Sequence, residues 1–160
     1  MAIMCVAAAN ILVELTNQYN SEKPYGERIS MTCKRLQKLL YFSEAEYMKR
    51  YNGEAMFTED FFAWPSGPVI PSVYSKFAQF QSGEMAIVEG EHTPPTSEMI
   101  AVLDYVFKKT IGIDTIDLVD KSHIDKGPWS LVFDGNDPKH MQVISKSSIY
   151  EYYSTRNIFE

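Results

Sequence analysis

Apolar residues recur at helical spacing over two long segments in the N-terminal part of this chain. The first segment, residues 2–19, carries them at i, i+3 and i+4 positions, a pattern typical of an amphipathic helix. The second covers residues 31–51, with Ser30 as its expected N-cap and Asn52-Gly53 as its expected end, because glycine suits a left-handed residue after a helix. These segments predict two helices joined by a polar loop.

The C-terminal half predicts three further helices. Residues 96–110 keep apolar side chains at helical spacing without a gap. Asp114 is expected to cap a short helix that runs towards His123, with Asp117 in the position of a capping box. Residues 126–137 contain turn signals, and a last helix is expected to begin near Ser145.

Residues 54–80 have a different pattern. The aromatic pieces MF and FFAW lie between polar turns and predict two short strands or extended segments. A turn rich in proline follows, and Pro71 can be the first residue of another helix. The sequence MAIV, residues 85–88, is a further candidate strand. The expected fold class is therefore mainly α: a single compact helical domain over residues 1–160 with a small β-hairpin or short-strand element.

Length and charge narrow the classes of function. The chain has 160 residues, a length typical of one domain, and a net charge of −6. Nucleic-acid-binding domains concentrate positive charge because phosphate neutralisation dominates their affinity. Direct nucleic-acid binding is therefore disfavoured. The basic residues of the second predicted helix are expected to form a solvated face: Lys34, Arg35, Lys38, Lys49 and Arg50.

The cysteines favour a reducing compartment, and the hydropathy pattern disfavours a membrane span and a signal peptide. Cys5 and Cys33 lie in apolar helical patterns and lack metal-ligand spacing, as buried free thiols do. No apolar run reaches the length of a membrane span. The apolar N-terminal segment lacks a basic region and is interrupted by Glu14, so a mature helix is expected there instead of a signal peptide. We therefore expect a cytoplasmic protein without a membrane partner.

The search for catalytic or cofactor chemistry yields weak candidates. Cys33 and His123 form the one conceivable nucleophile–base pair, but Cys33 has no visible activating context. There is no glycine-rich phosphate loop. A loose set of potential metal ligands lacks the spacing of a metal site: His123, Asp125, Asp134, Asp137 and His140. We expect no catalytic residue, no metal and no cofactor, and hence a protein that is not an enzyme.

Two groupings with fixed spacing remain. The first is Trp64-x-x-Gly67-Pro68-Val69-x-Pro71-x-x-Tyr74. The second is Ser-His at residues 122–123 followed by Gly-Pro-Trp at residues 127–129. A histidine at a helix C-terminus can donate to free carbonyls, or its cation can interact with the helix dipole. Either grouping can lock a loop onto the core or contact a partner, and for the Trp64 side chain we expect the structural role.

These groupings resemble the Panacea antitoxin domain family of SocA-like and GepA-type phage-associated proteins. The resemblance rests on KLLYF at residues 38–42, on F-x-A-W-x-x-G-P-V-x-P-x-x-Y beginning at Phe61 or Phe62, and on S-H-x-x-x-G-P-W from Ser122. The ending I-S-K-S-S-I-Y-E-Y-Y, residues 144–153, is similar to the family's closing helix. The likeness covers residues 34–153, nearly the whole chain.

The resemblance implies an antitoxin of a bacterial or phage toxin–antitoxin pair. Its partner would be a cognate toxin encoded nearby, neutralised by direct protein–protein contact. In the alternative implied by SocA-like members, the chain is an adaptor that delivers a toxin or another protein to an AAA+ protease, or a phage-associated regulator. A homo-oligomer is compatible with the sequence. The residues carried over as family landmarks or partner contacts are Phe62, Trp64, Gly67, Pro68, Val69, Pro71, Tyr74, His123, Pro128 and Trp129.

Overall fold

The computed structural model describes residues 1–80 and 85–160. It confirms the mainly helical fold class with a small antiparallel sheet. In chain order the elements are α1 (Cys5–Ser21), the 3-10 helix η1 (Tyr25–Glu27), α2 (Cys33–Arg50), β1 (Phe61–Trp64), β2 (Gly67–Val69), α3 (Pro71–Phe77), α4 (Ser97–Thr110), α5 (Thr115–Ser122), α6 (Pro128–Val132), β3 (Val143–Ile144) and α7 (Lys146–Tyr153). Within the described ranges, every helix is too short or too polar to span a bilayer.

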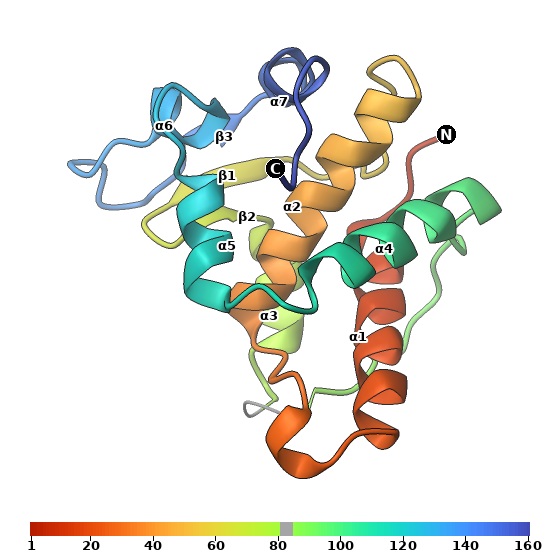
Figure 1. The fold of residues 1–160 in the computed structure, drawn as a ribbon. Coiled ribbons are helices and arrows are strands. Elements are labelled where there is room, and N and C mark those ends of the chain that lie inside the picture. Colours follow the sequence, from red (N-terminus) through yellow and green to blue (C-terminus); the bar gives the residue numbers. More distant parts are fainter. Residues whose placement is uncertain (81–84) are drawn as a thin grey trace.

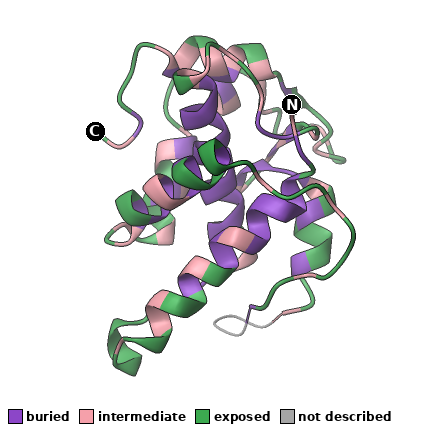
Figure 2. Cartoon of the chain, turned by 90° about the vertical axis from the view of Figure 1, so that its right-hand side faces the viewer, coloured by how far each residue is buried: buried purple, intermediate pink, exposed green. Residues whose placement is uncertain are grey.

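Helix α2 passes through the centre of the fold. It contacts α1, α4, α5, α7 and strand β2, and these elements surround it in Figure 1. Every residue from Arg35 to Met48 is buried, and Figure 2 shows α2 buried over most of its length. A helix buried on all sides is usually apolar all round. Here it also carries buried polar side chains, among them Arg35, Lys38 and Glu44, and these need partners inside the protein.

The solvated basic face expected on this helix is therefore wrong for two of its residues. Arg35 is 5% exposed and Lys38 is 0% exposed. The Arg35 guanidinium donates to the carbonyl oxygens of Ile113 at 2.8 Å and Thr110 at 2.7 Å. It thereby ties the α4–α5 connection to α2, which explains its burial: a buried charge is tolerated where hydrogen bonds replace its water.

Helix caps confirm some predicted starts and correct others. The Thr96 and Ser145 side chains each accept a backbone N–H of the first turn, in agreement with the predicted starts of α4 at residue 96 and of α7 near Ser145. For α2 the cap is Thr32, which accepts from the Arg35 backbone N–H, and the prediction of Ser30 is wrong. The Asp114 side chain makes no capping hydrogen bond at α5, so the expected capping box is absent there.

The sheet has the strand order β2-β1-β3 and is antiparallel. Trp64 pairs with Gly67, so residues 65–66 form the tip of a tight hairpin. Phe61 pairs with Ile144 of β3, a strand that the sequence pattern did not predict. Of the expected extended pieces, FFAW is β1, whereas Phe57 of the MF pair makes only an isolated bridge to Ile3.

Two further segments differ from expectation. Residues 85–88 form no strand. The Asn10 side chain holds them instead, donating to the Val88 carbonyl and accepting the Val88 N–H, both at 2.8 Å. The Gly-Pro-Trp turn signal begins a short helix, α6, because Pro128 occupies its first turn, where proline is well tolerated.

Candidate functional site

The three motif segments meet beside the middle of α2. The Lys38 ammonium nitrogen donates to the Pro68 carbonyl of β2 at 2.9 Å. The neighbouring Gln37 side chain accepts the Ile70 N–H at 2.8 Å. From the other side, the Trp129 indole N–H donates to the Trp64 carbonyl at 2.8 Å. We call this meeting point the motif junction, formed by Lys38, Trp64, Gly67, Pro68, Ser122, His123 and Trp129.

Gly67 is required at the motif junction for two separate reasons. Its φ of +113° lies in a region that residues with a side chain rarely adopt. A Cβ at this position would lie 2.6 Å from Lys38 Cε and 2.7 Å from Ser122 Oγ. The hairpin backbone can therefore approach α2 and α5 this closely only because residue 67 has no side chain.

Burial determines the protonation of Lys38. Removal of its ammonium group from water lowers its pKa from 10.5 to about 7, with a smaller contribution from the positive charge of Lys34. Between pH 7 and 10.5 the folded state has lost a proton that the unfolded chain still binds. Stability therefore rises with pH across this window and is flat with respect to this group below it.

The Lys38→Met variant tests this account of the buried amine. In wild-type protein, the free energy of unfolding should rise between pH 7 and 10.5 by up to about 1.4 kcal/mol per pH unit. The variant should lose most of this rise, whereas Lys76→Met, at an exposed lysine of α3, should keep it. Urea denaturation at several pH values measures both. If the free energy of unfolding changed with pH in the same way for wild type and Lys38→Met, Lys38 would not titrate in this range.

His123 lies at the end of α5 and stacks on Trp129. Their ring centroids are 3.7 Å apart with an interplanar angle of 9°, and the stack continues from Trp129 to Phe133 at 4.5 Å. Burial, and secondarily the charge of Lys38, lowers the pKa of His123, which favours the neutral ring. The expected donation from the ring to helix carbonyls is absent: the backbone N–H makes those bonds, and the buried Nε2 has no partner among the described residues.

Two aromatic side chains lie on the face of the sheet that points away from the core, and Tyr74 of α3 contacts one of them. Phe62 and Trp64 alternate with the buried Phe61 and Ala63 along β1. The Trp64 ring lies 5.3 Å from the Tyr74 ring of α3, and Tyr74 is 36% exposed. All three are half-buried or exposed and lie outside the main hydrophobic cluster of the described residues. We call Phe62, Trp64 and Tyr74 the outer aromatic cluster.

The structure thus divides the predicted site residues into two groups. Four of them are buried and can act on a partner only through the shape of the backbone: Gly67, Pro68, Val69 and Pro128. The others retain some accessible surface: Phe62, Trp64, Pro71, Tyr74, His123 and Trp129. The sequence did not reveal that Lys38 and Ser122 join this site as buried residues. The available signal was a lysine preceding an unbroken apolar run in KLLYF.

The candidate catalytic groups show no activation. Burial raises the pKa of the Cys33 thiol, which disfavours the nucleophilic thiolate. Burial also raises the pKa of Cys5, more strongly. In residues 1–80 and 85–160, no three His, Cys, Asp or Glu side chains are grouped so that they could hold a metal ion. What the motif junction does show is a set of hydrogen bonds that fix three segments relative to one another.

Comparison with known proteins places the chain in a family. A family model described as "Antitoxin SocA-like, Panacea domain" matches residues 36–130, which include most of α2, the hairpin and α5. The match covers more than half of the chain, and the chain therefore belongs to the SocA-like Panacea antitoxin family. Searches of curated proteins and of solved structures gave no match.

Proposed function

We propose that this chain is a cytoplasmic antitoxin that neutralises a cognate toxin, encoded nearby, by direct protein–protein binding. The observation that carries the proposal is the family match over residues 36–130. The hydrogen bonds of the motif junction support it, because they use the motif residues to fix a shape. The proposed unit is the whole chain, residues 1–160, since α7 and α1 both pack on α2.

Among the motif residues, we propose that the outer aromatic cluster contacts the toxin. Tyrosine and tryptophan are enriched in protein interfaces and among the residues that dominate binding energy. The Trp64 and Tyr74 rings contact each other at an interplanar angle of 60°, so they present a preorganised aromatic surface. Because Trp64 lies outside the main hydrophobic cluster of the described residues, we propose a contact role for it in place of the structural role expected from the sequence. Its truncation should then lower affinity without removing part of the main core.

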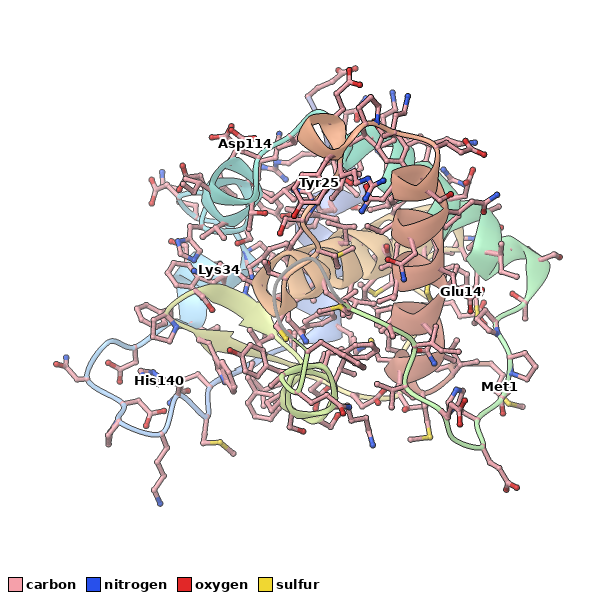
Figure 3. All side chains as sticks on the ribbon, turned by 90° about the horizontal axis from the view of Figure 1, so that it is seen from below. Met1, Glu14, Tyr25, Lys34, Asp114 and His140 are labelled. Carbon is pink, nitrogen blue, oxygen red and sulfur yellow. The ribbon has the colours of Figure 1, made fainter. Side chains whose placement is uncertain are left out.

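Trp64→Ala is expected to weaken toxin binding without unfolding the protein. The variant should bind the toxin about 10- to 30-fold more weakly, roughly 1.4–2 kcal/mol, and should still unfold cooperatively. The Trp64 carbonyl that accepts from Trp129 belongs to the backbone and is retained. Tyr25→Ala is the matched control, because Tyr25 is an aromatic residue that is 87% exposed on η1. Tyr25 is labelled in Figure 3. Calorimetry of binding and a thermal melt give the two readouts.

The test of the function itself is co-expression with the neighbouring gene. Toxicity of the neighbour, rescued by this chain in a stable complex, is the expected result. Rescue without a complex that disappears in a host lacking an AAA+ protease would identify a proteolytic adaptor instead. Retention on DNA that falls steeply with salt would indicate a nucleic-acid-binding regulator. Absence of both toxicity and binding would refute the antitoxin assignment for that pair.

A further inference from the structure

Helix α5 exposes aliphatic side chains where an ordinary surface helix is polar. Ile116 is 75% exposed, more than any other isoleucine in the described ranges, and Ile124, just past the helix end, is 46% exposed. The buried side of the same helix carries Leu118 and Ser122. Figure 1 shows α5 at the outside of the fold, next to α2 and β2. Most of the Ile116 side chain therefore makes no contact within the folded monomer.

Carboxylates surround these isoleucines. Asp117 and Asp120 are exposed on α5, and Asp114 and Asp125 are exposed at its two ends. Ile116 and Asp120 are four residues apart and Asp117 and Asp120 three apart, so they share one side of the helix. None of the four carboxylates forms an ion pair with another described residue. From Asp114 to Asp125 the net charge is −3, half of the chain's net charge of −6.

We propose that this side of α5, formed by Ile116, Asp117, Asp120 and Ile124, is a docking surface for a positively charged segment of the toxin that carries apolar anchors. The inference rests on the proposed function, which supplies the toxin as partner. Complementary charge selects such a segment and accelerates its association. The exposed isoleucines supply the apolar contact that keeps it bound, because charge pairs at a wet surface contribute little by themselves.

The surroundings of Ile124 indicate how the bound segment is oriented along α5. Ile124 also borders an open cleft of about 380 Å³, with Phe42 and Ile158 among its lining residues. Lys121, Arg156 and Glu160 line the same cleft, so its charges are mixed and do not select a cation. The positive charges of the partner should therefore lie over Asp117 and Asp120, and an apolar side chain should lie at the Ile124 end.

Two variants of α5 test the surface with the co-expressed toxin as probe. Ile116→Ser should weaken binding about tenfold, mainly through faster dissociation. The Asp117→Asn/Asp120→Asn double variant should slow association about fivefold at low salt, with the difference shrinking as salt screens the charges. Matched controls are Ile100→Ser, at an isoleucine of α4 that is 42% exposed, and Glu14→Gln, at an exposed acid of α1. Figure 3 shows Glu14 well away from Asp114, the residue preceding α5.

The outcomes separate this inference from the proposed function. Weaker toxin binding by the α5 variants, with normal thermal melts and with unchanged binding by the control variants, supports the docking surface. Wild-type binding that the α5 variants retain in full would overturn the surface and leave the antitoxin function intact. Equal losses of affinity in the α5 variants and the control variants would also overturn the docking surface, because the effect would then not be specific to α5. Failure of the wild type to bind would overturn the proposed function and this surface together.

Discussion

Glu44→Ala is expected to lower the free energy of unfolding by about 3–5 kcal/mol, because it removes a buried carboxylate that pairs with a partly exposed lysine and accepts two backbone N–H groups. The Glu44 side chain is 0% exposed, and one of its oxygens lies 2.5 Å from the Lys146 ammonium nitrogen of α7. The other oxygen accepts the backbone N–H groups of Met56 and Phe57, at 2.8 and 3.2 Å. Its loss would leave buried donors without an acceptor and detach two segments from α2.

Urea denaturation measures this loss, with Glu46→Ala as the matched control on the same helix. Glu46 is also buried, but the side chain of its partner Arg50 is 34% exposed, so removal of Glu46 should cost less than removal of Glu44. The transition should keep a single step, and an unchanged slope would show that the folded state remains compact. A loss below about 1 kcal/mol for Glu44→Ala would mean that the ion pair and its backbone bonds do not anchor these segments.

Gly67→Ala is expected to cost about 2–5 kcal/mol, the sum of backbone strain and overpacking. The strain comes from a φ of +113°, and the overpacking comes from a Cβ placed 2.6 Å from Lys38 Cε. Gly112→Ala is the control, because no atom lies within 4 Å of its added Cβ and its φ is ordinary. That variant should be neutral or slightly stabilising, by less than about 1 kcal/mol.

A double variant separates the two contributions at Gly67. Adding Ser122→Ala removes the hydroxyl oxygen that lies 2.7 Å from the new Cβ. The combined loss should then be smaller than the sum of the single losses, since the residues share one contact. The strain from the positive φ should persist. Strict additivity of the two variants would show that the close approach to α5 makes no contribution.

Local periodicity predicted the positions of the long helices well but not what surrounds them. Residues 31–51 were expected as a helix, and α2 covers Cys33–Arg50. The sequence placed Arg35 and Lys38 in water because charged residues are rarely buried without partners. Those partners are carbonyls far along the chain, 75 residues away for the Arg35 bond to Thr110. A pattern within one helix cannot contain that information.

The same limit explains the errors in the extended segments and at the site. Strand β3 has only two residues and exists because it pairs with β1, more than 80 positions earlier. The MAIV segment has strand-like residues, but the Asn10 side chain uses the hydrogen-bonding groups of Val88. At the site, spacing and family resemblance identified the motif residues. Their convergence on Lys38 is a tertiary property, visible only once the hairpin packs against α2.

Apart from the Glu44–Lys146 ion pair, the buried polar side chains of α2 bind their surroundings mainly at main-chain atoms. Arg35 donates to backbone carbonyls, Gln37 accepts a backbone N–H, and Glu44 accepts two. Such attachments do not depend on which side chains the surrounding segments carry. Exposed positions on the hairpin and on α5 can therefore change while their backbones stay in place. The fold can acquire a different outer surface, and with it a different partner, without any change to its interior.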